Sequence, residues 1–414
     1  MQINHLARLV SIVLRGMTLG SKFLLIFILA RFLTPAELGL YGLLAATIGY
    51  ALYLLGLDFY TYTTRELLKR PREEWGGLLK DQGVLTMLLY AIFIPLLLII
   101  FAMDLLPWHL AGWFVILLVL EHLNQELMRL LVAISEQLMA GLVLFLRLGA
   151  WAVVIAILMY FEPATRSLEA VLAAWTLGGL SAFLLACVKL SQLHIGGWSK
   201  RVDWTWIQTG IKVALPFLVA TLAIRGVYTL DRYWLESLSG LEVLGAYVLF
   251  IGIANAMLSF LDAGVFAFSY PGLIRAFQQG QTAEFRQGLR RLMIQTVALS
   301  GAFSIVALLF IDPLLGWLDK PLYIEQKGLF PWILLAIFLS ALGMIPHYAL
   351  YAKNYDKPII HSHVAAFVVF MVATWLISQH WPMFAVPMGL CIAFFAVLVW
   401  KSYAYFRFAP APFN

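Results

Sequence analysis

The sequence predicts an all-α polytopic membrane protein: twelve transmembrane helices in two pseudo-symmetric six-helix bundles around a central cavity. Three observations lead to this fold class. Hydrophobic residues make up 63% of the chain and charged residues 12%, whereas a soluble domain carries roughly 25% charged residues. Apolar runs long enough to cross a bilayer recur along the whole length. Two similar segments also lie about half a chain apart, which indicates an internal repeat.

The apolar runs divide into twelve expected spans. Lipid offers the backbone no hydrogen bonds, so only helices and closed barrels cross it, and barrel strands would alternate in polarity where these runs do not. Dipeptides ending in proline, such as Thr34-Pro35 and Asp312-Pro313, mark connections between the runs. The expected spans are 10–31, 38–58, 82–103, 110–131, 138–160, 168–189, 208–230, 241–262, 289–311, 329–351, 359–378 and 383–402.

The first span lies within SIVLRGMTLGSKFLLIFILARFL, residues 11–33. This segment carries Arg15, Lys22 and Arg31, and it lacks the short apolar core and small-residue cleavage site of a secretory signal. We therefore expect it to remain as the first membrane anchor. Its cations need an explanation, because hydrocarbon disfavours charge.

The connections between spans are short on one side of the membrane and longer on the other. The longest inner loops, at 59–81, 190–207 and 263–288, are expected to carry short amphipathic helices. No extramembrane segment is large enough to form a domain. Any function must therefore reside in the membrane bundle.

The distribution of lysine and arginine orients the chain. With the N-terminus inside, inner segments hold 19 of the 28 basic residues, outer segments hold 5, and 4 lie within spans. Cytoplasmic loops of membrane proteins carry such an excess. We therefore expect both termini to be cytoplasmic.

The two halves of the chain resemble each other. ELGLYGLLAATIGYALYLLGLDF at 37–59 resembles EVLGAYVLFIGIANAMLSFLDAG at 242–264. In both, an acidic residue precedes Gly-x-Tyr at the start of a span, and Leu-Asp closes its inner end. The copies lie 204–206 residues apart, which is six spans, so both halves enter from the same side and enclose a site. The predicted lobes are residues 1–195 and 196–414.

Several classes of function are disfavoured. The sequence pI of about 9.2 does not indicate nucleic-acid binding, because the cations are scattered between spans and no basic domain holds them. Cys187 and Cys391 lie within apolar runs, so we expect neither a disulfide framework nor a metal site. No nucleophile motif appears, and His361 and His363 are interpreted as interfacial. The sequence therefore predicts neither an enzyme nor a bound cofactor.

Four cations lie within the spans, and their depth decides which of them need a function. A cation at the bilayer centre costs about 2.5–3.5 kcal/mol, and less near a helix end, where long side chains reach the headgroups. At about 1.5 Å per residue, Arg15 and Arg225 lie only about 8 Å from an edge of the membrane. Snorkelling therefore explains these two cations as well as a function does. Lys22 and Arg147 are deeper. For these, snorkelling, an ion pair with Glu121 and a hydrated cavity for anionic cargo remain as alternatives.

Spacing favours the cavity. Arg15 and Lys22 are seven residues apart and share one helix face, and Arg225 and Arg232 repeat this interval in the second half. Polar faces avoid lipid, so we expect them to point inward. A surplus of positive charge suits an anion, above all phosphate, which guanidinium binds in a bidentate manner and ammonium binds as a point charge.

The fourth span adds a second polar stripe. Glu121, Gln125 and Arg129 follow one another at intervals of four, with Asn124 beside them, and Asp58 lies near the inner edge of the second span. Glu121, Asn124, Gln125 and Asp58 are candidate coupling or cavity residues. Coupling to H+ or Na+ is left open, because desolvation and a neighbouring cation act in opposite directions on the protonation of Glu121.

Two segments carry a resemblance to a known family. LARFLTPAELGLYGLL at 29–44 and GLDFYTYTTREL at 56–67 resemble the N-terminal signature of bacterial polysaccharide or oligosaccharide (O-antigen-type) flippases, which belong to the multidrug/oligosaccharidyl-lipid/polysaccharide exporter superfamily. The similarity covers roughly residues 10–75, and the twelve-span layout agrees over the rest. The lipid II flippase branch usually has fourteen spans, which counts against that assignment.

The resemblance implies a transporter in the bacterial inner membrane. Such a protein flips undecaprenyl-diphosphate-linked oligosaccharide from the cytoplasmic to the periplasmic leaflet by alternating access, alongside glycosyltransferases and a polysaccharide polymerase. Family members present a cationic central cavity. Arg15, Lys22, Arg147 and Arg225 are the matching candidates here.

Two other functions stay open. A cation-coupled drug antiporter of the same superfamily would need acidic residues deep in the membrane. By its position in a predicted span, only Glu121 is convincingly deep. A membrane-embedded glycan polymerase or ligase would usually need a sizeable periplasmic loop, which the predicted topology lacks. A scaffold without transport activity would have no reason to keep Lys22.

Overall fold

The computed structural model describes residues 5–408, and for residues 5–9, 11 and 12 it describes the backbone alone. Within the described part every regular element is a helix, as the composition predicts. The predicted cytoplasmic placement of the two chain ends concerns residues 1–4 and 409–414, which lie outside the described residues.

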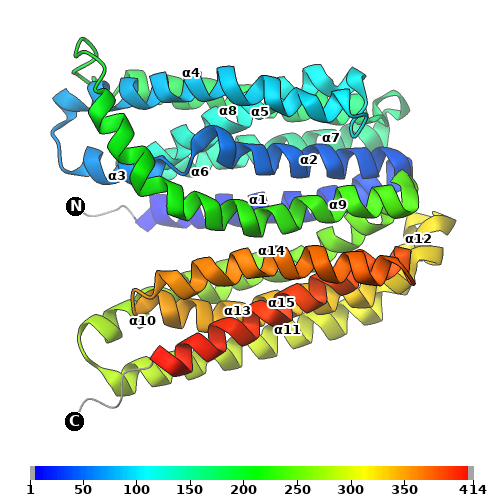
Figure 1. Cartoon of the computed structure of the whole chain (residues 1–414). Coiled ribbons are helices and arrows are strands. Elements are labelled where there is room, and N and C mark those ends of the chain that lie inside the picture. The colour runs from blue at the N-terminus through cyan, green and yellow to red at the C-terminus, as the bar shows by residue number, and fades with distance from the viewer. Residues whose placement is uncertain (1–4, 409–414) are drawn as a thin grey trace. The chain divides into compact units, whose positions relative to one another are not determined.

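In the first half of the chain, α6, the π-helical turn η2 and α7 run on as one continuous helix, which is the fifth span (Figure 1). The elements of this half are α1 (His5–Phe32), α2 (Pro35–Gly56), α3 (Tyr60–Leu68), α4 (Arg72–Ala102), η1 (Trp108–Leu110), α5 (Ala111–Ala133), α6 (Gln137–Phe145), η2 (Leu146–Ala150), α7 (Trp151–Phe161), η3 (Pro163–Thr165) and α8 (Leu168–Ser191).

In the second half, α9 contains two spans. Gly240 breaks it, because its backbone (φ 84°, ψ 169°) leaves the helical region. The elements of this half are α9 (Trp204–Leu261), η4 (Asp262–Phe266), α10 (Ala267–Gln278), α11 (Thr282–Leu318), α12 (Pro321–Glu325), η5 (Gln326–Gly328), α13 (Leu329–Ala352), α14 (Asp356–Ser378) and α15 (Pro382–Phe408).

The number of spans agrees with the sequence prediction. Among the described residues, ten helical stretches are long and apolar enough to cross a membrane. The stretch Trp204–Gln278 counts once but holds two spans, and α5 adds another, although it carries Glu121, Glu126 and Arg129. Each of the twelve expected spans therefore coincides with a helix, and the fold class is confirmed.

The chain packs as two compact units. The N-terminal unit comprises Met1–Leu33 and Leu43–Leu218, and the C-terminal unit comprises Thr34–Gly42 and Val219–Asn414. Each unit buries aromatic rings of its own. In the N-terminal unit the rings of Phe101 and Phe114 lie 5.5 Å apart, and in the C-terminal unit Phe250 and Phe330 lie at the same distance. The division falls inside α2 and α9 rather than in the loop at 190–207.

The start of α2 is fixed by a capping box. The carboxylate of Glu37 accepts hydrogen bonds from the backbone N–H of Thr34 at 2.9 Å and from its hydroxyl at 2.8 Å. The hydroxyl oxygen of Thr34 in turn accepts from the backbone N–H of Glu37 at 3.2 Å. Pro35 occupies the first helical position, where its missing N–H costs nothing. The Thr-Pro signal therefore predicts this helix start correctly.

The repeated Gly-x-Tyr segments contact each other within the C-terminal unit. A Cβ added to Gly39 would lie 2.4 Å from the carbonyl oxygen of Leu241, and one added to Gly245 would lie 2.0 Å from that of Pro35. Both glycines of the repeat therefore permit a close backbone approach, as small residues do between membrane helices. The two copies of the repeat meet at equivalent positions.

The helix of the ninth span ends later than the sequence predicts. The sequence places the end of the ninth span at 311, before Asp312-Pro313, whereas α11 continues through Pro313 to Leu318. A proline within a helix removes one backbone hydrogen bond, and Lys327 holds the carboxylate of Asp312 at 2.5 Å. The helix instead ends at Asp319, whose backbone is left-handed (φ 56°).

The three loops that the sequence predicts to be inner differ in structure. Short helices form in the loops at 59–81 and 263–288, as predicted, but the loop at 190–207 contains no helix before α9 begins. This loop lies against α4 instead. The backbone N–H of Gly76 donates to the carbonyl of Gly196 at 2.8 Å, and a Cβ on Gly76 would lie 2.4 Å from that oxygen.

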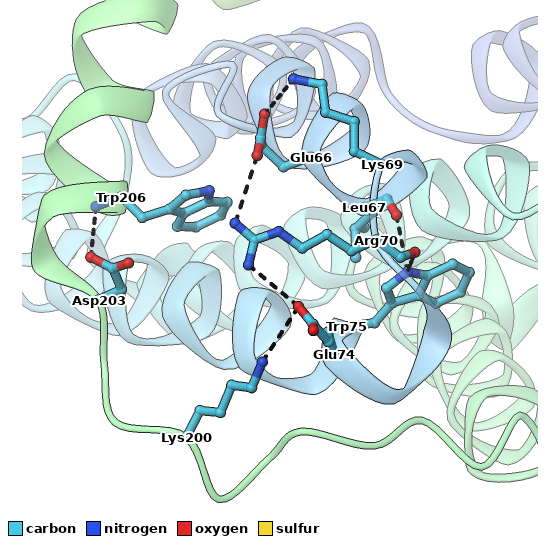
Figure 2. Close-up of polar contacts among 9 residues, drawn as sticks. All are labelled: Glu66, Leu67, Lys69, Arg70, Glu74, Trp75, Lys200, Asp203 and Trp206. Carbon is cyan, nitrogen blue, oxygen red and sulfur yellow. Dashed lines mark hydrogen bonds and ion pairs between the residues drawn. The ribbon is translucent and has the colours of Figure 1, made fainter.

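Charged side chains hold this loop in place (Figure 2). The carboxylate of Glu74 lies 3.8 Å from Arg70 and 3.4 Å from Lys200. Asp203 accepts a hydrogen bond from the backbone N–H of Trp206 at 2.9 Å, which caps the start of α9. The chain between α8 and α9 is therefore attached to the N-terminal unit.

Candidate functional site

The deepest predicted guanidinium, that of Arg147, forms an ion pair. Arg147 lies on η2, and its Nη2 and Nε atoms lie 2.5 and 2.6 Å from Oε2 of Glu121 on α5. Trp175 Nε1 donates to the other carboxylate oxygen at 2.8 Å. Both charged side chains are buried. Of the alternatives that the sequence leaves open for Arg147, the structure shows the ion pair with Glu121.

Aromatic and amide groups enclose this pair. The rings of Trp151 and Trp175 are stacked, with centroids 5.8 Å apart, and Trp151 Nε1 donates to the carbonyl of Arg147 at 2.8 Å. Asn124, a predicted cavity residue, is fully buried and donates to the carbonyl of Gly179 at 2.8 Å. Asn124 and the ion pair therefore link α5, η2 and α8 inside the N-terminal unit.

This arrangement corrects the expected charge balance. The sequence treats Arg147 as a cavity cation, but Glu121 neutralises it. Of the four predicted cavity cations, Arg15, Lys22 and Arg225 remain as predictions.

Arg15 and Lys22 are exposed along one edge of α1. At 3.6 residues per turn, they lie roughly half a turn around the helix from Val13, Met17 and Leu24, which form an exposed apolar edge. A buried stripe separates the two edges on one side of the helix. The apolar edge suits lipid, whereas the edge with Arg15 and Lys22 requires water or an anion.

Arg225 is exposed on the part of α9 that belongs to the C-terminal unit. Arg232, seven residues further along α9, has an acidic partner. Its Nη1 lies 3.0 Å from Asp231, and Asp231 is fully buried and accepts a hydrogen bond from the hydroxyl of Tyr247 at 2.6 Å. The sequence misses Asp231 because it ends the seventh span at 230, whereas the helix continues to Gly240.

The predicted stripe on α5 divides into separate contacts. Glu121 pairs with Arg147, whereas Arg129 pairs with Glu126 at 2.6 Å. Gln125 is half-buried. The sequence does not single out Glu126, which also accepts a hydrogen bond from Gln82 at 2.7 Å. Its position directly after Gln125 of the stripe is the sequence signal that could have identified Glu126.

The inner end of the N-terminal unit gathers further polar groups. Asp58 is buried just after α2, with a left-handed backbone (φ 52°). The guanidinium of Arg129 lies 3.6 Å from the ring centroid of Tyr60 on α3. Burial raises the pKa of the Tyr60 phenol, and Arg129 opposes this shift. The phenol therefore stays protonated at neutral pH, and its ring serves as a cation–π surface.

A second polar cluster lies in the C-terminal unit. Lys401 on α15 is buried, and its Nζ atom lies 3.2 Å from Nδ1 of His347 on α13 and 3.2 Å from Nε2 of His363 on α14. The sequence interprets His363 as interfacial and does not single out Lys401 or His347, so it misses the contact among the three side chains. Basic residues at matching depths in three neighbouring spans are the signal that points to this cluster.

Asp262, the counterpart of Asp58 in the repeat, lies on the π-helical turn η4 and is exposed. No group of three or more His, Cys, Asp or Glu side chains within residues 5–408 is placed to hold a metal ion.

No family model matches the chain, and no curated protein matches it. Solved structures do. A multidrug resistance MATE family transporter of the MOP superfamily in an inward-facing conformation matches with a TM-score of 0.75 at 13% identity, over 96% of this chain and 98% of that one. A multidrug resistance MATE family transporter of the same superfamily in an outward-facing conformation gives 0.57 at 13% identity, over 97% and 96%.

A third solved structure differs in its binding pocket. It is a MOP superfamily transporter from Pyrococcus furiosus, described as having a binding pocket of reverse polarity that suggests a different function. It gives a TM-score of 0.61 at 13% identity, over 98% of this chain and 96% of that one. These likenesses establish the fold: a twelve-span helical membrane protein. More particularly, it is the fold of the MATE transporters of the MOP superfamily.

Proposed function

We propose that this protein is an alternating-access transporter that flips undecaprenyl-diphosphate-linked oligosaccharide from the cytoplasmic to the periplasmic leaflet of a bacterial inner membrane. One observation carries the proposal: Arg15, Lys22 and Arg225 are exposed on membrane-spanning helices. The fold supports transport, since the three solved structures above are transporters with this fold. In this role the protein acts between glycosyltransferases that assemble the lipid-linked glycan and a polymerase of the surface polysaccharide (O-antigen).

Three acidic residues of the spans have arginine partners. Glu121, Glu126 and Asp231 each pair with an arginine in the interior of their own unit. Their charges are satisfied where they lie, so they add little negative potential at the exposed edges. In the proposed function, the exposed Arg15, Lys22 and Arg225 face an anionic cargo.

The two edges of α1 favour a lipid-linked anion over a free one. Val13, Met17 and Leu24 form an apolar edge, and Arg15 and Lys22 form a cationic edge of the same helix. A polyprenyl diphosphate has both characters, because its chain is apolar and its diphosphate is charged. Arg15 can bind phosphate oxygens in a bidentate manner, and Lys22 attracts them as a point charge. The N-terminal signature supports the same cargo.

A second candidate function is a cation-coupled drug antiporter. Two of the named structures are multidrug transporters, and Asp262 is an exposed carboxylate on a π-helical turn. π-helical turns occur often at functional sites. In this alternative, Asp262 contacts the cationic drug or the coupling ion.

Transport by the reconstituted full-length protein separates the two functions. In vesicles containing a fluorescent undecaprenyl-diphosphate oligosaccharide, we expect the wild type to move the lipid between leaflets. We expect Lys22→Ala to slow it by about tenfold, which corresponds to about 1.4 kcal/mol of lost interaction. Asp262→Asn is the matched control and should keep the wild-type rate.

The opposite pattern supports the antiporter. It consists of export of a cationic dye that Asp262→Asn abolishes and Lys22→Ala leaves unchanged, with no movement of the lipid diphosphate. That result would overturn the flippase proposal.

A further inference from the structure

The cluster of Lys401, His347 and His363 has a role that the exposed cations do not explain. It brings three basic nitrogen atoms from three different helices together, with both N–N distances to Nζ at 3.2 Å. Lys401 is only 3% exposed. Among the described residues, no carboxylate lies within ion-pair distance of it. A buried ammonium without a counterion is costly, so this arrangement requires a reason.

The hydrogen bonds allow two protonation states. A lysine ammonium has three donors and no acceptor, so in the charged state both imidazoles are neutral and accept from it. When Lys401 gives up a proton, its nitrogen gains a lone pair and can accept a hydrogen bond from one of the two imidazoles. The same three side chains can therefore hold one proton or release it. For the imidazole to donate, its ring proton must lie on the nitrogen that faces Lys401.

The cluster lies at one end of the C-terminal unit, close enough to exchange protons with water. Lys401 lies seven residues before the end of α15, His363 seven residues after the start of α14, and His347 five residues before the end of α13. At about 1.5 Å per residue, all three are about 8–10 Å from the same end of the unit. Figure 1 shows α13, α14 and α15 together in this unit.

Other charged and titratable groups surround the cluster, among them Arg286 of α11, which interacts electrostatically with Lys353 and Tyr405. On α13, the ring of Tyr348 lies 5.5 Å from that of His347, and Tyr270 of α10 stacks on Tyr348. The carboxylate of Asp262 on η4 interacts electrostatically with Tyr348. Lys353, at the end of α13, lies over the ring of Tyr405 on α15.

We propose that Lys401, His347 and His363 form a proton-binding site, and that its occupancy sets the balance between two packings of α13, α14 and α15. The loaded site carries one positive charge, and the empty site carries none. The proton leaves Lys401 for water at the end of the unit where α13 and α15 end. Packing that closes the helices around the cluster favours the empty site, and packing that admits water favours the loaded one. Because it supplies the coupling ion, this inference rests on the proposed transport function.

The test is hydrogen exchange of α13–α15 in the purified full-length protein in lipid nanodiscs, measured from pH 5.5 to pH 9 without cargo. After correction for intrinsic exchange rates, we expect one pH-dependent step in protection, with up to about a tenfold change per pH unit for a single proton. Lys401→Met should remove the step. Lys357→Met, an exposed lysine on α14, is the matched control and should keep it.

A histidine pair covers the case in which Lys401→Met does not fold. His363→Gln should move the step by at least about one pH unit, a tenfold change in proton affinity, and His361→Gln, exposed on the same helix, should leave it in place. A wild type without a step, a step retained in Lys401→Met, or equal effects of the two histidine variants would overturn the proposal. Failure to move lipid diphosphate would overturn the proposed function and leave this titration unaffected.

Discussion

A charged side chain inside a membrane-spanning helix is stable when a partner or water stabilises it. Arg147 has the carboxylate of Glu121, and Arg232 has that of Asp231. Lys401 has two imidazoles. Each of these contacts lies within one of the two units. Arg15, Lys22 and Arg225 are exposed instead, and in the proposed function they contact the cargo.

The first prediction at this scale concerns Arg147. Arg147→Ala leaves Glu121 buried without its cation, which should lower the free energy of unfolding by about 3–5 kcal/mol. The double variant Glu121→Gln/Arg147→Met should recover most of this loss. Unfolding in detergent with increasing denaturant measures both values.

Arg15→Ala serves as the control, because Arg15 is exposed and its loss should change stability by at most about 0.5 kcal/mol. A fully stable Arg147→Ala protein that fails in transport would show that Arg147 binds the cargo, as the sequence alone suggests.

The sequence identifies some of these charged residues but not their partners. Depth along the chain identifies Arg147 and Glu121 as charges that need partners, and the structure supplies those partners. Depth does not identify Asp231, because the end of a span cannot be read to the residue when the helix continues beyond the apolar run. Nor does it identify the partners of Lys401, since those come from two other helices. Pairing across helices is a tertiary property.

The elements follow the sequence more closely. Apolar runs and the Thr34–Glu37 capping box place the helices, and the repeat places Gly39 and Gly245 at equivalent starts of spans. Pro313 gives a wrong helix end, because a membrane helix can continue through a proline near its end. The π-helical turns η2 and η4 have no sequence signal that we recognise, although they hold Arg147 and Asp262.

The prediction at the element scale compares two glycines. Gly245→Ala places a Cβ 2.0 Å from the carbonyl oxygen of Pro35 and should destabilise the protein by about 1–3 kcal/mol, since the backbones must separate. Gly49→Ala, in α2, meets no atom within 4 Å and should stabilise it by up to about 1 kcal/mol. Thermal unfolding of both variants measures the difference. Equal effects would show that the close approach is not required.

The whole molecule combines two units that share one architecture. Twelve spans with basic inner loops predict that both termini and the loop between α8 and α9 lie in the cytoplasm. The fold follows from composition and periodicity because the bilayer restricts the chain to helices of a given length. The cargo does not follow in this way, since a shared fold carries many functions.

Topology can be measured with single cysteines in a variant in which Cys187 and Cys391 are replaced by alanine. Ala164→Cys, exposed between α7 and α8, should react with a membrane-impermeant maleimide in intact spheroplasts. Ser199→Cys, exposed between α8 and α9, should react only after permeabilisation. Reaction of Ser199→Cys in intact spheroplasts would reverse the orientation and, with it, the direction of transport.

The most direct test of the central claim is a charge series at Lys22 in the lipid-flipping assay. If the ammonium of Lys22 attracts a diphosphate headgroup, flipping should fall about tenfold in Lys22→Ala and recover in part in Lys22→Arg, because a guanidinium keeps the charge. Lys357→Ala, which changes an exposed lysine on α14, should flip at the wild-type rate. Wild-type flipping by Lys22→Ala, at equal amounts of folded protein, would contradict the claim that exposed cations carry the cargo.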